Sequence, residues 1–187
     1  ADQVITSGET TTAVDLTSPT TDVTFAWTVS VPTGITGVTT LTGTDNIPAE
    51  TLINSTTAPL DVVYTAIATG DVGFDCEGLP TDYTVTVNPE AQVNPVDDQV
   101  VCNDENLTIE FSTIVTGGTT TFSWTNDNTA IGLDATGTGN IDITAINTTD
   151  QPLTANIVVT PSFENDGDTN TGDPITFTIT VNPTGQV

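Results

Sequence analysis

The sequence predicts an all-β protein made of two tandem immunoglobulin-like β-sandwich domains, each with about seven strands. Three observations support this prediction: alternating runs of β-branched residues, turn residues at short intervals, and an internal repeat. Val, Ile and Thr branch at Cβ and pack well on a pleated surface, while 15 Gly and 11 Pro punctuate the chain. No stretch has the 3.6-residue period of a helix, and no apolar run is long enough to cross a membrane.

Five sequence blocks occur twice in the same order, at offsets of 93 to 97 residues. They begin at Asp2 and Asp98, Phe25 and Phe122, Thr42 and Thr136, Asn54 and Asn147, and Thr84 and Thr178. A nearly constant offset indicates two copies of one domain, with insertions confined to loops. We therefore expect one repeat over residues 1–89, a linker over 90–97, and a second repeat over 98–187 whose end runs into the next linker.

Each copy contains about seven short segments with strand character. In the first copy they lie near 2–5, 11–16, 23–29, 35–41, 46–53, 61–68 and 82–87, and in the second near 99–102, 107–111, 120–125, 131–135, 140–146, 154–160 and 175–181. On the third strand of each copy an aromatic pair shares one face, Phe25 with Trp27 and Phe122 with Trp124. One core Trp per domain is typical of an immunoglobulin-like sandwich, so we expect these four residues in the two cores.

The predicted linker contains Pro89 at its edge and Pro95 near its end. Proline fixes φ and disfavours helix, which predicts a short, semi-rigid connector. Residues 182–187 copy the start of this connector. The 187 residues are therefore expected to be part of a longer array of repeats.

The chain has no Lys, Arg or His against 25 Asp and Glu, which gives a formal net charge of −25. Without a basic side chain it cannot bind nucleic acid or an anionic membrane through charge. It also has no imidazole for acid–base catalysis, no lysine for a Schiff base and no histidine metal ligand. No carboxylate pair stands in a recognisable catalytic motif, so we expect no enzyme. The expected partners are neighbouring repeats, cations, glycans or external surfaces.

Two acidic clusters have the composition of a calcium site, because Ca²⁺ prefers carboxylate, amide and backbone oxygens. One comprises Glu164, Asp166 and Asp168 around a glycine, and the other comprises Asp97 and Asp98 with Asp104 and Glu105. The alternative is that both clusters are solvated loops of a very acidic protein. Calcium is thus the one cofactor that the sequence suggests, and no catalytic residue is expected.

Asn54, Asn106 and Asn147 begin Asn-x-Ser/Thr sequons. Such matches arise easily in a chain rich in Thr and Asn, so they predict little about glycosylation.

The phrases Thr-Val-Thr-Val-Asn-Pro (84–89), Asp-Gln-Val-Val-Cys-Asn (98–103), Phe-Ser-Trp-Thr (122–125) and Gly-Thr-Gly-Asn-Ile (137–141) carry a family resemblance. Together they resemble the tandem Ig-like or PKD-like repeats of very large surface adhesins of Bacteroidota, such as the gliding-motility adhesin SprB. The resemblance implies type IX secretion and an extracellular stalk at the cell surface.

Repeats of that family often carry one Cys after the opening Val-Val and another before the last strand. This chain splits the pair, with Cys102 in the second copy and Cys76 in the first. A bridge between them needs Cα atoms within about 7 Å, and we expect both residues at the N-terminal pole of their own domain. We favour two unpaired thiols. The other two alternatives are a Cys76–Cys102 bridge and an intermolecular disulfide.

The function that these observations favour is a structural repeat segment of a long extracellular adhesin or filament, an extended acidic stalk that serves adhesion or gliding motility. Two other functions stay open at this point. One is a binding module whose loops recognise glycans or surfaces, and the other is a filament subunit that exchanges strands between chains.

Overall fold

The computed structural model describes residues 2–70 and 76–185 of the chain. Contacts divide the chain between Pro89 and Glu90 into two compact units, with Asn165–Asp168 grouped with the first. We call them unit 1 and unit 2. Both are built from β-strands that form one larger and one smaller sheet. The predicted fold class, two tandem immunoglobulin-like sandwiches, is confirmed.

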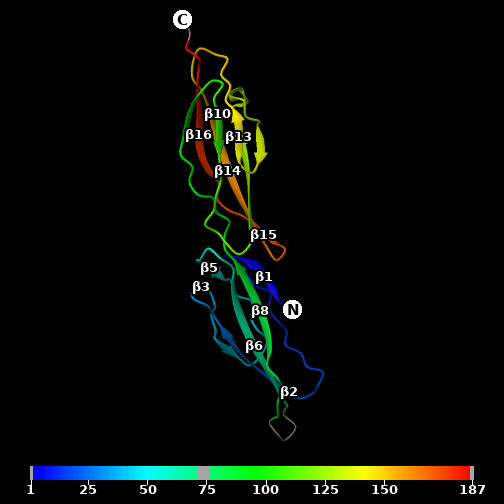
Figure 1. Cartoon of the computed structure of the whole chain (residues 1–187). Helices are drawn as coiled ribbons and strands as arrows, with labels where there is room; N and C mark the ends of the chain where they lie inside the picture. Colours follow the sequence, from blue (N-terminus) through cyan, green and yellow to red (C-terminus); the bar gives the residue numbers. More distant parts are fainter. Residues whose placement is uncertain (1, 71–75, 186–187) are drawn as a thin grey trace. The chain divides into compact units, whose positions relative to one another are not determined.

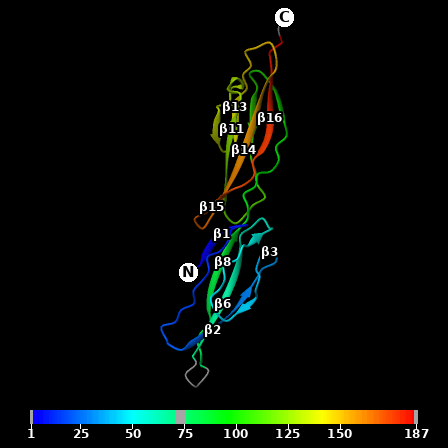
Figure 2. The ribbon, with the colours of Figure 1, turned by 180° about the vertical axis from the view of Figure 1, so that it is seen from behind.

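The described residues of unit 1 form eight strands, and Figures 1 and 2 show the unit from two sides. Their bounds are β1 Gln3–Thr6, β2 Val23–Ser30, β3 Ile35–Thr36, β4 Thr42–Gly43, β5 Ile53–Asn54, β6 Leu60–Gly70, β7 Cys76–Glu77 and β8 Thr81–Asn88. The larger sheet has the order β1-β8-β6-β2-β4, with β7 paired to β6, and the smaller one joins β3 to β5. Among the described strands of the larger sheet, β1 and β8 pair in parallel and the other pairs are antiparallel.

Unit 2 repeats this arrangement, with eight strands and one 3₁₀ turn in the part of it that the structure describes. Their bounds are β9 Gln99–Cys102, β10 Asn106–Ile109, β11 Thr119–Asn126, η1 Thr129–Ile131, β12 Thr136–Thr138, β13 Ile141–Thr144, β14 Leu153–Asn165, β15 Asp168–Thr171 and β16 Ile175–Asn182. The order β12-β11-β14-β16-β9 matches that of unit 1, including the parallel pair at its edge. The smaller sheet joins β10 to β13.

Two of the predicted strands are wrong, and two others are much shorter than predicted, since β3 covers only Ile35–Thr36 of 35–41 and β5 includes only Ile53 of 46–53. Residues 11–16 form no strand; this part of unit 1 is held by isolated bridges, Thr10 to Thr51 and Val14 to Ile47. Residues 131–135 begin in η1, because the Asn128 side chain accepts a hydrogen bond from the Ala130 N–H and Gly132 adopts a left-handed φ of 90°. The short strands β4, β7, β12 and β15 were not predicted.

The interior of each unit is apolar and lies between its two sheets. On β2 and β11 the burial alternates as the sequence predicts, with Trp27 and Trp124 buried and the intervening Thr and Ala or Ser residues exposed. Phe25 and Phe122 lie on the same face as the tryptophans and are half-buried. Aliphatic side chains of the long strands complete each core. Among the described residues, no helix is long and apolar enough to span a membrane.

Candidate functional sites

Each core tryptophan packs against a glycine of the neighbouring strand. Trp27 pairs with Gly43, and Trp124 pairs with Gly137 at the equivalent position. A Cβ on either glycine would lie 2.4 Å or 2.1 Å from the indole ring. The indole N–H donates a hydrogen bond to a backbone carbonyl just beyond that glycine, of Asp45 in unit 1 and Gly139 in unit 2. The repeated Thr-Gly-Thr block therefore serves the packing of the tryptophan.

One buried asparagine in each unit connects the smaller layer to the strand of the larger sheet that comes last in sequence, β8 in unit 1 and β16 in unit 2. Asn54 donates hydrogen bonds of 2.8 Å to the carbonyl oxygens of Ala58 and Val87. Its Oδ1 accepts from the N–H and the hydroxyl of Thr56, at 2.9 and 2.7 Å. We call this arrangement the asparagine clasp. All four hydrogen-bonding positions of the carboxamide are satisfied, so this buried polar group carries no unpaired donor or acceptor.

Unit 2 contains the same clasp. Asn147 donates to the carbonyl oxygens of Gln151 and Val181, and accepts from the N–H and hydroxyl of Thr149. The Asn-x-Thr pattern at both sites therefore has a structural reason, since the threonine two residues on supplies two donors to the asparagine. Asn106, which begins the third sequon, is exposed and only accepts a hydrogen bond from Thr144. The clasp was not predicted from the sequence, although the recurring Asn block was its signal.

Unit 1 contains a buried carboxylate, Glu50, which is 4% exposed. Its Oε1 accepts hydrogen bonds from the N–H and the hydroxyl of Thr39, at 2.6 and 2.8 Å. Its Oε2 accepts a hydrogen bond of 2.7 Å from the hydroxyl of Tyr64. Its backbone N–H donates to the Thr11 hydroxyl, and its carbonyl accepts from the Thr11 N–H. Neutral donors alone therefore hold this charge, because the chain has no Lys, Arg or His.

The electrostatics of this group follow from its surroundings. Burial by itself raises the pKa of Glu50, but the hydrogen bonds from Thr39 and Tyr64 outweigh it and hold the pKa below its ordinary value. Burial, and then the hydrogen bond to Glu50, raise the pKa of Tyr64. Both oxygens of Glu50 are committed to these partners, so the carboxylate has the character of a structural group rather than a catalytic base.

The acidic residues expected to bind calcium near the start of the second repeat lie in two places. Asp97 and Asp98 precede β9, whereas Asp104 and Glu105 follow it. At about 3.3 Å per residue, the four residues of β9 put roughly 13 Å between the two pairs.

Three side chains of this set make local hydrogen bonds. Asp98 accepts a 2.7 Å hydrogen bond from the Thr178 N–H, which lowers its pKa. Glu105 accepts a hydrogen bond from the Cys102 N–H. Asp104 accepts one from the Asn103 side chain and has a left-handed φ of 66°. The structure therefore does not bring the four residues together.

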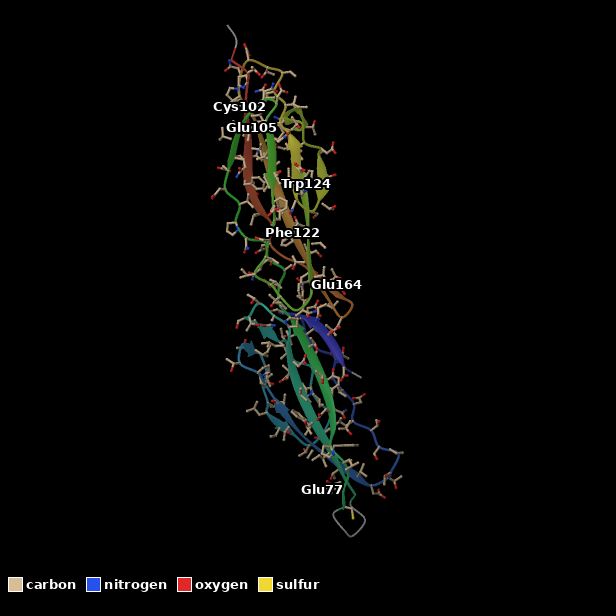
Figure 3. The ribbon with its side chains drawn as sticks, viewed as in Figure 1. Glu77, Cys102, Glu105, Phe122, Trp124 and Glu164 are labelled. Atoms are coloured by element: carbon tan, nitrogen blue, oxygen red, sulfur yellow. The ribbon has the colours of Figure 1, made fainter. Side chains whose placement is uncertain are left out.

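The other acidic cluster lies on the hairpin that joins β14 to β15. Asp166 and Gly167 are its two turn residues, with φ of 50° and 82°. Positive φ at both central positions is typical of a type I′ turn, for which Asp-Gly is a preferred pair. The Asp166-Gly167 pair is thus explained by hairpin geometry, while Glu164 and Asp168 lie in the flanking strands. In Figure 3, Glu164 lies at the opposite end of unit 2 from Glu105.

Nowhere in residues 2–70 and 76–185 do three or more Asp, Glu or Cys side chains gather in a way that could hold a metal ion. Calcium binding by Glu164, Asp166 and Asp168, or by Asp97, Asp98, Asp104 and Glu105, stays a prediction.

Both cysteines are free and exposed. Cys76 begins β7, and Cys102 ends β9. The expectation that Cys102 lies at the N-terminal pole of its domain is wrong. Strand β9 runs parallel to β16, so Cys102 lies beside Asn182, where the chain leaves unit 2. Figure 3 shows Cys102 near Glu105 at that end.

The predicted linker makes defined contacts with the rest of unit 2. Ala91 is 2% exposed and forms a small buried cluster with Val115 and Phe163. Its N–H donates a 2.8 Å hydrogen bond to Asn170. Farther along, Val93 and Val96 pack against the main core, and the Asn94 N–H donates to the Ser112 carbonyl. Pro95 stands between these anchored positions, and Pro89 closes unit 1.

The comparisons with known proteins give one family match. Residues 3–91, which cover unit 1 and just under half of the chain, match a family described as PKD-like domain. No curated protein matches the chain.

Several solved structures are similar over nearly the whole chain, at low identity. They include Clostridium thermocellum CbhA fibronectin(III)-like modules (18% identity, TM-score 0.36, covering 98% of this chain and 90% of that one). They also include Dpr11 IG1 bound to DIP-gamma IG+IG2 (8%, 0.42, 97% and 94%) and a chimeric titin Z1Z2-Z1Z2 tandem (15%, 0.27, 98% and 95%). The strand order of the two units establishes the sandwich fold independently. Unit 1 is thus similar to a PKD-like domain, and unit 2 is a second sandwich of the same strand order.

Proposed function

We propose that this chain is a structural repeat segment of a long extracellular surface adhesin or filament, in which it acts as an acidic stalk for adhesion or gliding motility. The observation that carries the proposal is the duplication of structural devices. Both units place the tryptophan–glycine pair and the asparagine clasp at equivalent positions. Tandem repetition of one core design is typical of repeat modules that extend a chain.

The composition supports the same role. A charge of −25 without a single basic residue discourages association between neighbouring copies and leaves trypsin-like proteases no cleavage site. The PKD-like match of unit 1 is consistent with a surface location, since domains of this kind are commonly extracellular. Glu50, the buried carboxylate, is occupied by structural hydrogen bonds.

Sedimentation velocity of the whole chain tests the stalk against the strand-exchanging filament. A stalk segment stays monomeric from micromolar to millimolar concentration at physiological salt. Self-association that grows with concentration and incubation time would favour the filament subunit instead.

A glycan array probed with the same chain tests the stalk against the binding module. The proposal expects no reproducible binding above that of an unrelated protein of equal charge. Sequencing of the flanking gene provides the direct test of the array, with further copies of the Asn-Pro connector and the Phe-x-Trp strand expected on either side. Flanks without any further copy would contradict the proposal.

A further inference from the structure

Unit 1 has a cavity of about 440 Å³ between its two layers. From the larger sheet it is lined by Phe25, Ala66, Ala68 and Tyr83, and from the facing layer by Leu16 among others. Tyr83 is mostly buried, and its hydroxyl has no hydrogen-bond partner among the described residues. A buried hydroxyl without a partner costs free energy, so this end of unit 1 is incomplete as it stands.

Unit 2 fills the corresponding space with larger side chains. The two units can be aligned on their tryptophans. Trp27 pairs with Ala66 on β6, and Trp124 pairs with Val159 on β14. By that register, the positions of Ala66, Ala68 and Thr81 carry Val159, Pro161 and Ile175 in unit 2, and that of Tyr83 carries Phe177. Phe177 packs against Phe111, with ring centroids 6.4 Å apart. The smaller side chains of Ala66, Ala68 and Thr81 therefore leave the cavity open in unit 1.

In unit 2, this end of the sandwich is also covered by the chain that enters the unit. Residues 90–93 lie beside Asp173 and Ile175. Gly172 leaves no room for a side chain, because a Cβ there would lie 1.7 Å from the Ala91 carbonyl oxygen. With Ala91 buried and Val93 and Val96 against the core, the entering segment is a fixed part of the unit 2 sandwich.

Within residues 2–70 and 76–185, no segment covers the matching edge of unit 1 in this way. Leu79 lies at the position of Asp173, lines the cavity and is 90% exposed. The point of entry is nevertheless the same in both units. Asp2 accepts a hydrogen bond from the Thr84 N–H, as Asp98 does from the Thr178 N–H, and Asp2 also lines the cavity. A segment that precedes Asp2 would thus start from the rim of the cavity.

We infer that the cavity of unit 1 is the binding site of the polypeptide segment directly preceding Asp2. This segment is an extended, uncharged stretch with small apolar side chains like those of Ala91–Val96. This inference rests on the proposed function, because a preceding repeat of the same chain supplies the segment. The apolar side chains cover Leu79 and enter the cavity, and a backbone carbonyl of the segment accepts the hydrogen bond of the Tyr83 hydroxyl. Residues 91–96 carry no charge, so such a segment avoids repulsion by Asp2 and Asp82 at the rim.

The test is a graft on the whole chain. A copy of residues 88–97 (Asn-Pro-Glu-Ala-Gln-Val-Asn-Pro-Val-Asp) replaces Ala1, which keeps the spacing to Asp2 that unit 2 has to Asp98. The matched control carries Ser at the three positions copied from Ala91, Val93 and Val96. Methyl NMR reports the environment of Leu79, Ala66 and Ala68, and hydrogen–deuterium exchange reports the protection of residues 81–87.

We expect the apolar graft to shift the methyl resonances of Leu79, Ala66 and Ala68. It should slow exchange over residues 81–87 by about tenfold or more, as burial of two valines implies. The serine graft should change neither, and unit 2 should be unaffected by both. Adding Tyr83→Phe to the apolar graft should leave the methyl shifts in place and reduce the gain in protection.

Equal behaviour of the apolar and serine grafts, or shifts confined to residues outside the cavity, would overturn the inference. Its failure is distinguishable from failure of the proposed function. Flanking repeats and a monomeric chain would then still support the stalk, with unit 1 left uncovered.

Discussion

The hydroxyl of Tyr64 lies 2.7 Å from Oε2 of Glu50, and it donates a hydrogen bond to a carboxylate that is buried in a chain without any cationic side chain. Tyr64 also packs edge-on against Trp27, with ring centroids 5.8 Å apart. The polar pair is therefore built into the aromatic core of unit 1. By strand register, the position of Tyr64 carries Ile157 in unit 2, so the arrangement belongs to one repeat only.

Replacing Tyr64 by Phe should lower the free energy of unfolding of unit 1 by about 1–3 kcal/mol, because a buried acceptor loses its donor. Urea unfolding of the whole chain, with methyl NMR to assign the transition to a unit, measures this change. Tyr83→Phe is the matched control, since the Tyr83 hydroxyl has no partner among the described residues. We expect that control to be neutral or stabilising, and a loss as large as that of Tyr64→Phe would contradict the assignment.

Unit 1 should lose stability at low pH through Glu50. The pKa of this carboxyl is below its ordinary value in the folded protein, so the stabilisation is complete above the ordinary value and is lost as the pH falls through the lowered one. Glu50→Gln removes this titration. The difference in free energy of unfolding between wild type and Glu50→Gln should therefore shrink between pH 6 and pH 3. A constant difference would show that the buried carboxylate does not titrate with folding.

Unit 1 should also be the alkali-sensitive part of the chain. Burial raises the pKa of Tyr83 to about 12 and raises that of Tyr64 as well, and these are the two tyrosines of the chain. A raised folded-state pKa favours the protonated phenol, so its stabilisation is complete below about pH 10 and is lost as the pH rises further. Tyrosinate absorbance and methyl spectra between pH 9 and 12.5 should change together for unit 1, while unit 2 persists to higher pH. Simultaneous unfolding of both units would refute this.

Removal of either asparagine clasp should lower the free energy of unfolding of its unit. Asn54→Ala and Asn147→Ala each leave buried carbonyl oxygens and a threonine donor without partners, and we expect each to lower the free energy of unfolding of its own unit by about 2–4 kcal/mol. Asn106→Ala is the matched control from an exposed sequon and should change it by less than about 0.5 kcal/mol. Thermal and urea unfolding measure all three variants. Equal effects at the three sites would mean that the clasps are not structural.

The glycines beside the tryptophans should tolerate no side chain. Gly43→Ala and Gly137→Ala place a methyl group closer to the indole ring than van der Waals contact allows. Each should destabilise its unit by about 1–3 kcal/mol. Near-ultraviolet circular dichroism should report the displaced indole. Gly185→Ala serves as control because a Cβ there meets nothing within 4 Å. A neutral Gly43→Ala would show that Trp27 can move aside at no cost.

The duplicated domain could be predicted from the sequence because repetition and strand alternation are local signals. The Phe-x-Trp strands and the Thr-Gly-Thr and Asn blocks occur once in each copy, in the same order. The alternation on β2 and β11 then follows from the two-residue period of a strand. The acidic clusters were harder to interpret, because Asp-Gly satisfies both a metal loop and a type I′ turn, and only the backbone angles at Asp166 and Gly167 distinguish the two.

The sequence by itself determined the fold class and the presence of two repeats within this chain, since these depend on composition, internal repetition and local periodicity. Only the tertiary structure decided that Glu50 meets Tyr64, that Asn54 reaches Val87, and that residues 90–97 pack into unit 2. These partners are separated along the chain by loops whose course no local pattern fixes. The cavity of unit 1 emerged in the same way, because its walls come from strands that meet only after the sandwich has closed.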